Sequence, residues 1–462
     1  MDNQKKAEIL YGDIGDYLSR EEKLAKLRQG RSFFGIDLNP IHPNEHGDWL
    51  TTRDEAFQNY IPLESEKKFA GNSRGFFEGY SLGIASNKDA FVYNFSKTKM
   101  IESVEKMVSF YNDQRVKFNA YSKGASAKDF VQYDPSRIVW TDLFLKGIND
   151  NKALTADVKN VAVSLYRPFC KQSFFYEKQL LQRTYRQTEL FPSPSSQNLV
   201  ICVQGLNARK TFSAYISNAI IDLNALEAGC QCFPLYYYEE NKGEKQGALF
   251  DRTKSEKYTR RDGISDHIHK LALEQYGSDV TREDIFYYVY GILHSKEYRT
   301  RFADDLKKSL PRLPLVDRRG DFEIFSKAGR ALANLHLNYE TQKPPKQVRV
   351  MGEEYQNYHV TKMRFGKKGR DKDKTIIQYN DWIRLENIPL EAYEYEVNGK
   401  SALEWGMERY AISTDKSSGI VNDPNDWAKE HGKPRYILDL LLSLITVSVE
   451  TLKIVRWLPK VF

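Results

Sequence analysis

The sequence predicts an α+β fold in which a mainly helical N-terminal part precedes a mixed sheet and a helical bundle. Apolar residues recur at helical spacing along 96–119, and aromatic and β-branched residues gather in short segments between 173 and 238. Longer helical runs return between 263 and 339. The chain has 462 residues, roughly three times the usual length of one domain, so we expect two or three packed units.

The first 150 residues are predicted to be mainly helical. Ser19 followed by Glu22 is typical of a capping box, which indicates a helix from Arg20 onwards. Ser96 to Asn119 places its apolar residues on one face, as in a long amphipathic helix. Helical runs are expected at 8–29, 53–60, 96–119 and 143–165, with a strand at 89–95.

The central third is predicted to contain a sheet packed beside a helical bundle. Strands are expected at 173–176, 199–203 and 232–238, and helices at 263–276, 282–294, 298–310 and 322–339. A connector rich in Pro and Lys follows at 341–354. Strand-like segments at 358–365, 375–379 and 392–397 and a final helix at 426–454 complete the chain.

Composition excludes several classes of protein. Hydrophobic residues make up 41% and charged residues 28%, which excludes a collagen-like, disordered or disulfide-rich chain. The net charge of +7 fits a polyanionic partner but does not establish one. We expect four reduced, mostly buried cysteines and no metal site, because the Cys230-x-Cys232 pair lacks further ligands at zinc spacing. The polar N-terminus and the absence of a long apolar run predict a cytoplasmic protein.

No catalytic motif is evident. The single Pro-Pro pair, Pro344-Pro345, lies between lysines and does not fit the base-gripping loop of an adenine methyltransferase, and no glycine-rich cofactor turn accompanies it. Gly399-Lys400-Ser401 lacks the first glycine of a P-loop. Glu21 and Lys23, with Asp13 and Asp16 upstream, superficially resemble a nuclease carboxylate set, although a solvated charged helix is the simpler interpretation.

A basic segment between two strand-like runs is the clearest sign of nucleic-acid contact. Residues 362–374 hold seven cations against two anions and are predicted to form a β-hairpin with a basic tip. Such a hairpin can lie along a phosphate backbone, although a merely soluble turn would have the same composition. The candidate phosphate contacts are Lys362, Arg364, Lys367, Lys368, Arg370, Lys372 and Lys374.

Two further clusters mix cations with aromatic residues or precede a helix. Arg252, Lys254, Lys257, Arg260 and Arg261 form a second basic cluster, which either clamps a backbone or is a surface loop; of these, Arg260 and Arg261 are candidate DNA contacts. Arg167, Lys171 and Arg183 are candidates for base contact, because Arg and Lys favour guanine. An aromatic structural core is the alternative interpretation of the segment around Arg167.

Several stretches together resemble the C-terminal specificity region of Type ISP restriction–modification enzymes. They are 13–24 (DIGDYLSREEKL), 45–50 (EHGDWL), 91–96 (FVYNFS), 164–169 (SLYRPF), 231–239 (QCFPLYYYE), 283–294 (EDIFYYVYGILH), 335–340 (LHLNYE) and 434–440 (PRYILDL). The resemblance implies a helical, methyltransferase-proximal connector at 1–150 and a target-recognition domain of sheet and helices at 151–345. A β-hairpin and helix at 346–462 would complete the recognition domain.

In that family, as the resemblance implies, one chain joins a nuclease, a translocating motor, an adenine-N6 methyltransferase and a domain that recognises an asymmetric DNA site. This sequence holds no motor or methylase signature, so we expect S-adenosylmethionine, ATP and Mg²⁺ to bind only companion or absent domains. The first hypothesis is a double-stranded DNA recognition module of a phage-defence system, without activity alone. The alternatives are a regulatory fragment that docks on such an enzyme through 96–165, and a stand-alone nuclease.

Overall fold

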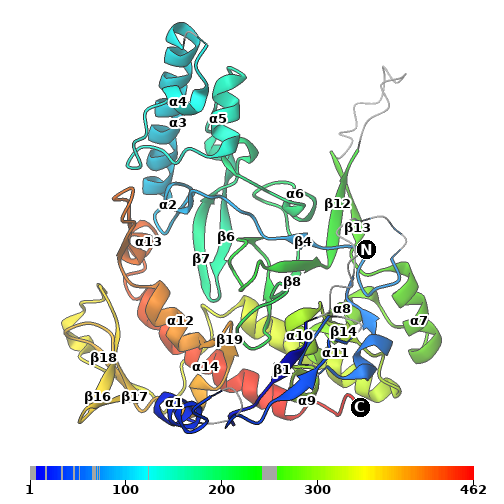
Figure 1. Cartoon of the computed structure of the whole chain (residues 1–462). Helices are drawn as coiled ribbons and strands as arrows, with labels where there is room; N and C mark the ends of the chain where they lie inside the picture. The colour runs from blue at the N-terminus through cyan, green and yellow to red at the C-terminus, as the bar shows by residue number, and fades with distance from the viewer. Residues whose placement is uncertain are drawn as a thin grey trace. The chain divides into compact units, whose positions relative to one another are not determined.

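The computed structural model describes residues 7–15, 18–32, 35–44, 47–50, 53–64, 69, 71, 73–122, 124–241 and 257–462. Contacts divide the chain into two compact units, Met1–Asp54 and Glu55–Phe462. The α+β class is confirmed, since helices and several small sheets alternate along the chain (Figure 1). Within the described residues, no helix combines the length and apolar composition needed to cross a bilayer.

The first unit holds a two-stranded sheet and one helix. Strand β1 (Ile9–Tyr11) pairs antiparallel with β2 (Asn39–Ile41), and α1 (Arg20–Gln29) lies between them in sequence. The capping box is confirmed, because the Ser19 hydroxyl accepts from the Glu22 amide and the Glu22 carboxylate accepts from the Ser19 amide. The helical expectation for residues 8–18 is wrong where β1 forms. Helix α1 buries none of its residues, which agrees with a solvated charged helix.

Helices of the second unit occur in three groups along the chain. The first group is α2 (Asp89–Val92), α3 (Lys97–Tyr121), α4 (Ala127–Phe130), α5 (Asp142–Asn149) and α6 (Gln187–Leu190). The second is α7 (Asp266–Tyr276), α8 (Arg282–Ile292), α9 (Lys296–Arg301), α10 (Asp305–Lys308) and α11 (Arg319–Leu337). The third is α12 (Ala402–Arg409), α13 (Pro424–Glu430) and α14 (Tyr436–Arg456).

Three four-stranded sheets organise the strands of this unit. Their orders are β10-β6-β7-β5, β4-β11-β8-β9 and β15-β18-β17-β16. The first contains β5 (Tyr93–Asn94), β6 (Val161–Arg167), β7 (Cys170–Phe175) and β10 (Ile220–Ile221). The second contains β4 (Ser81–Leu82), β8 (Val200–Val203), β9 (Ala214–Ser217) and β11 (Gln231–Pro234). The third contains β15 (Arg349–Met351), β16 (Arg364–Lys368), β17 (Asp371–Gln378) and β18 (Arg384–Glu386).

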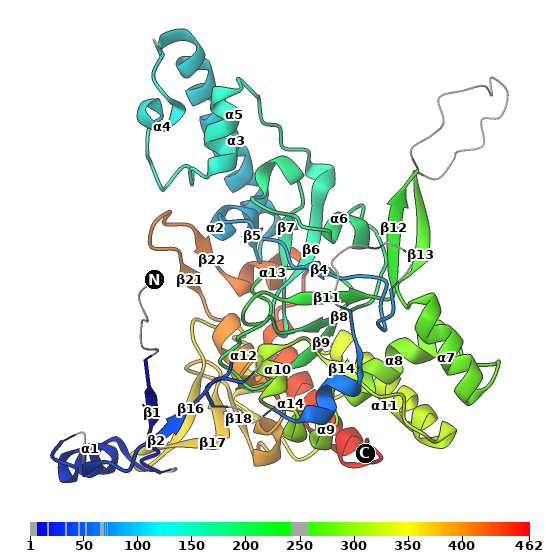
Figure 2. The same ribbon diagram turned by 45° about the vertical axis from the view of Figure 1, so that its right-hand side comes forward.

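Short two-stranded ribbons complete the fold. They are β3 (Ile61–Pro62) with β14 (Arg312–Leu313), β12 (Tyr236–Glu240) with β13 (Tyr258–Asp262), β19 (Glu396–Val397) with β20 (Lys400–Ser401), and β21 (Ser413–Thr414) with β22 (Val421–Asn422). Figures 1 and 2 both show the β12–β13 ribbon and the β16–β17 hairpin on different sides of the second unit.

The second sheet separates two hydrophobic cores, which explains its uninterrupted apolar strands. Along β8, Val200 and Cys202 face one core, whereas Ile201 and Val203 face the other, because successive side chains of a strand point to opposite faces. One core joins α3 to α5, the first and third sheets, α12 and α14. The other is filled by α7 to α11, so the predicted bundle beside a sheet is confirmed.

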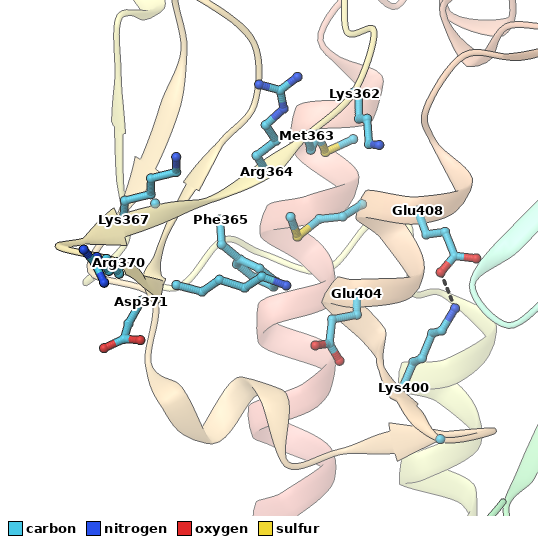
Figure 3. A pocket seen from close by; sticks show the side chains of 14 residues that line it. Lys362, Met363, Arg364, Phe365, Lys367, Arg370, Asp371, Lys400, Glu404 and Glu408 are labelled. Carbon is cyan, nitrogen blue, oxygen red and sulfur yellow. Dashed lines mark hydrogen bonds and ion pairs between the residues drawn. The ribbon is translucent and has the colours of Figure 1, made fainter.

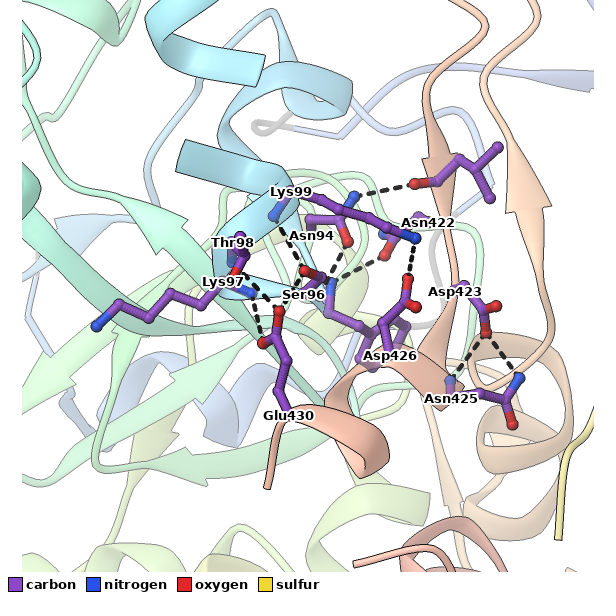
Figure 4. Close-up of polar contacts among 12 residues, drawn as sticks. Asn94, Ser96, Lys97, Thr98, Lys99, Asn422, Asp423, Asn425, Asp426 and Glu430 are labelled. Carbon is purple, nitrogen blue, oxygen red and sulfur yellow. Dashed lines mark hydrogen bonds and ion pairs between the residues drawn. The ribbon is translucent and has the colours of Figure 1, made fainter. Parts of the chain in front are cut away.

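The long helix α3 begins at Ser96, as predicted, and its first turn is fixed by a distant segment (Figure 4). The Ser96 hydroxyl accepts from the Lys99 amide at 3.0 Å. The Glu430 carboxylate of α13 accepts from the Lys97 amide at 3.0 Å and from the Ser96 hydroxyl at 2.5 Å. Acidic groups at a helix N-terminus also complement its dipole. These contacts join the first and the last of the three predicted segments, 1–150, 151–345 and 346–462. The division into those segments stays a prediction.

Several local predictions were wrong for identifiable reasons. Residues 143–165 are not one helix, because α5 ends at Asn149 and the β-branched segment from Val161 pairs with β7 instead. Residues 89–92 are helical, and only Tyr93 and Asn94 form a strand. The C-terminal helix is interrupted at 431–435, where Gly432 has a φ of +62° and precedes Pro434 by two residues.

Candidate nucleic-acid interface

The predicted basic hairpin is present as β16 and β17. The two strands are antiparallel and are joined by a two-residue turn, Gly369-Arg370. Gly369 has a φ of +65°, and open space surrounds the position of a Cβ there. A glycine with positive φ at the first central position is typical of the two-residue turns that match strand twist. The segment is therefore an ordered hairpin whose tip extends into solvent.

Six of its seven predicted cations are exposed, and their side chains make no hydrogen bond or ion pair with any described residue. They are Lys362, Arg364, Lys367, Lys368, Arg370 and Lys372. Lys374 differs, because its amine lies 3.1 Å from a Glu404 carboxylate oxygen and above the rings of Phe365 and Tyr393. We therefore assign Lys374 a structural contact, and its DNA contact stays a prediction.

Two lysines of the hairpin face each other without a compensating anion. Lys367 and Lys372 are directly opposite in the strand register. Like charges in that arrangement destabilise a sheet. On α12, Glu404 binds Lys374 and Glu408 contacts both Lys400 and Arg409, and the hairpin itself carries two further carboxylates, Asp371 and Asp373. The hairpin thus carries an excess of positive charge, which its two aspartates offset only in part.

A cleft of about 710 Å³ separates the hairpin from α12. Figure 3 shows Phe365 pointing toward α12, whereas Arg364 points away from it. Burial alone would raise the pKa of Glu404, but hydrogen bonds from Ser401 and Lys374 lower it. The carboxylate therefore stays ionised at neutral pH and fixes Lys374 in the wall of the cleft.

A second, more polar cleft of about 510 Å³ adjoins the first, because Lys362 and Arg364 line both. Its other lining residues come from segments 357–361 and 378–382. These residues were not among the candidates predicted from the sequence. The only sequence signal was Trp382 in a polar turn, which the structure leaves 51% exposed.

The second basic cluster is largely neutralised within the protein. Arg261 pairs with Glu239 at 3.0 Å and Lys257 pairs with Glu240 at 3.6 Å, across the β12–β13 ribbon. The Arg260 guanidinium lies 4.3 Å from the centre of the Tyr236 ring. Arg252 and Lys254 lie outside the described residues. DNA contact by Arg260 and Arg261 stays a prediction. Because both side chains already have partners within the protein, we expect them to bind phosphates less strongly than the hairpin cations do.

Arg167 is largely covered and contacts a buried carboxylate. Its guanidinium donates to Asp222 at 2.7 Å and lies 3.9 Å from the centre of the Tyr166 ring. Burial raises the pKa of Asp222, and the Arg167 charge opposes that rise. These contacts favour the alternative interpretation, a structural aromatic core.

The other two candidates for base contact differ from each other. The Lys171 amine lies 3.4 Å from Glu340 and is largely covered. Arg183 is exposed, makes no side-chain contact with described residues, and lines a separate cleft of about 600 Å³. Base contact by Arg167, Lys171 and Arg183 stays a prediction, and the structure does not bring the three to the basic hairpin.

The four cysteines are free and buried, as predicted. The sulfur atoms of Cys202, Cys230 and Cys232 lie within 4.8 Å of one another. Burial raises the pKa of each of these thiols well above its usual value. Cys202 thus joins the Cys230-x-Cys232 pair in one buried group of three thiols, which the spacing of the pair alone did not predict.

Comparison with known proteins gives concordant results. The Type ISP C-terminal specificity domain matches residues 75–440. A nuclease-deletion mutant of the Type ISP restriction–modification enzyme LlaGI, in complex with a DNA substrate mimic, is 34% identical with a TM-score of 0.84. The DNA-bound, ATP-dependent Type ISP enzyme LlaBIII is 34% identical (TM-score 0.83), and the DrdV–DNA complex is 25% identical (TM-score 0.80).

These matches cover nearly all of the chain but less than half of each neighbour. They span 99%, 99% and 98% of this chain, and 40%, 28% and 43% of the LlaGI, LlaBIII and DrdV chains, respectively. No curated protein gives a significant match.

Proposed function

The chain belongs to the Type ISP C-terminal specificity domain family, and on that premise we propose that it recognises a specific sequence in double-stranded DNA. The observation that carries the proposal is the β16–β17 hairpin, with six exposed cations whose side chains form no ion pair with a described residue. Cations at that density bind phosphates with release of counterions. The related enzymes LlaGI and LlaBIII are described in complex with DNA.

The catalytic steps of a restriction–modification system belong, in this proposal, to companion domains. A methyltransferase extrudes its adenine while a second domain grips the duplex from the other side, and this chain supplies that grip. S-adenosylmethionine, ATP and Mg²⁺ are bound by the methyltransferase and helicase–nuclease domains. The whole system acts in the cytoplasm, which also suits four free thiols.

The test is selection of the purified chain against a randomised duplex library at moderate salt, followed by sequencing of the bound pool. Enrichment of one asymmetric motif is the expected result, because specificity separates recognition from general attraction to polyanions. Binding that enriches no motif and disappears as salt rises would contradict the proposal and favour the docking fragment. Magnesium-dependent cutting of the pool would favour the nuclease alternative.

A further inference from the structure

The second, more polar cleft of about 510 Å³ has side chains of a different kind from those of the hairpin. It is lined by Asn357, His359, Thr361, Lys362, Arg364, Gln378, Asn380, Asp381 and Trp382. Such side chains provide donors and acceptors together, as hydrogen bonding to base edges requires. Trp382 and Tyr355 are both more than half exposed and lie with ring centres 5.0 Å apart at its edge. The cleft is therefore a polar surface with an aromatic border, directly beside a phosphate-binding element.

Asp381 is the informative residue of the cleft. It is exposed and forms no hydrogen bond or ion pair with another described residue. A carboxylate at a phosphate-binding surface repels the backbone, so charge attraction alone does not account for it. Carboxylates that face DNA productively accept hydrogen bonds from exocyclic amines, above all N4 of cytosine. The cations Lys362 and Arg364 line the same cleft, so a phosphate bound by them would lie beside Asp381.

The segments that carry these side chains are held in place by Asn380. Its Nδ2 donates to the carbonyl oxygens of Asn357 at 2.7 Å and His359 at 3.0 Å. Its Oδ1 accepts from the amides of Trp382 at 2.9 Å and Ile383 at 2.7 Å. One amide side chain thus ties the two lining segments together on both sides of Asp381. Base recognition requires such fixed geometry, because hydrogen bonds discriminate between bases only when the side chain is held in position.

We propose that this cleft contacts base edges in the major groove, and that Asp381 accepts a hydrogen bond from the exocyclic amine of cytosine or adenine. The inference rests on the proposed function and deepens it by assigning the sequence-determining surface. Phosphate contacts by the hairpin position the duplex without reporting its sequence, whereas the cleft supplies the discrimination. Asp381 then sets the preferred base at one position of the recognised sequence.

The test compares Asp381→Asn with Asp371→Asn in the randomised-duplex selection, using the full chain. Asp371 is an exposed carboxylate at the turn end of β17, opposite Lys368. Both variants remove one negative charge from the same basic region, and both residues are exposed, so folding is retained. Only Asp381→Asn changes the hydrogen-bonding pattern of the cleft, since the amide gains a donor.

In Asp381→Asn, we expect the base preference to change at least about fivefold at one position of the motif, in favour of adenine, with other positions unchanged, because the amide keeps an acceptor and adds a donor that suits adenine N7. Asp371→Asn keeps the wild-type motif. If Asp381→Asn enriches the wild-type motif with the same weights, or if both variants change it alike, the cleft inference is overturned and the proposed function stands. If the wild-type chain enriches nothing, both are overturned.

Discussion

The contribution of the hairpin to DNA binding can be isolated by comparing two triple variants of equal charge. The first is Lys367→Ala, Arg370→Ala and Lys372→Ala, which removes three exposed cations without protein partners. The second removes three cations of the second basic cluster, with the changes Lys257→Ala, Arg260→Ala and Arg261→Ala. Two of these cations pair with Glu239 and Glu240. Each variant lowers the net charge by three, so any difference reflects position rather than charge.

The expected magnitude follows from counterion release. Each phosphate contact contributes about 0.9 to the slope of log affinity against log salt for B-DNA. Loss of three contacts therefore lowers the steepness of that slope by about 2.7 in the hairpin variant. Between 50 and 200 mM salt, six contacts weaken binding by about 10³, whereas three contacts weaken it by only about 40-fold. The variant with Lys257, Arg260 and Arg261 replaced should lower the slope less than the hairpin variant does, because two of its cations are already paired with carboxylates.

Fluorescence anisotropy of a labelled mixed-sequence duplex, titrated with each variant at several salt concentrations, measures these slopes. A mixed sequence is suitable because phosphate contacts do not depend on base identity. Equal slopes for the wild type and the hairpin variant would refute the reasoning. An equal decrease of the slope in both triple variants would show that DNA binding depends on the net charge of the protein and not on the hairpin.

Three further predictions concern stability and are measured by urea unfolding. Arg167→Ala is expected to lower the free energy of unfolding by about 2 kcal/mol, because a charged donor to a buried carboxylate is lost, and an unchanged midpoint would contradict the structural role. Gly329→Ala places a Cβ 1.8 Å from the Tyr287 carbonyl oxygen, so we expect it to lower the free energy of unfolding by about 2 kcal/mol. The control is Gly320→Ala in the same helix, where a Cβ meets nothing within 4 Å, and it should be neutral or slightly stabilising. Burial, together with the charge of Arg299, lowers the pKa of His336 to about 3, so the folded state resists its protonation and stability is lost as pH falls below the unfolded value of about 6.5. Between pH 7.5 and 5.0 the contribution of His336 to this loss is about 2 kcal/mol, so His336→Gln should show a pH dependence weaker by that amount.

Local signals were enough to predict the helix after Ser96 and the basic hairpin. Both depend on residues close in sequence: apolar residues on one face of 96–119, and a dense run of cations between two strand-like segments at 362–374. The strand at Ile9–Tyr11 was missed, because it forms only by pairing with Asn39–Ile41. Apolar residues alone do not distinguish a short strand from a helical turn.

The role of Arg167 and the polar cleft could not be predicted, because both depend on distant contacts. Arg167 meets Asp222 only when the parallel pairing of β6 with β10 brings residues 55 positions apart together. The cleft forms because Asn380 joins its own turn to segment 357–359. Neither contact leaves a periodic pattern in the sequence. Composition therefore predicted a basic surface, and the structure indicated which of its cations remain exposed for a ligand.

The central claim is that DNA lies on the basic hairpin, and lysine acylation footprinting tests it most directly. The chain is acylated with and without a mixed-sequence duplex at low salt, and the modification of each lysine is measured by mass spectrometry. We predict protection of Lys362, Lys367, Lys368 and Lys372, with Lys257 unaffected. Equal reactivity of the hairpin lysines with and without duplex, or protection confined to Lys257, would contradict the account.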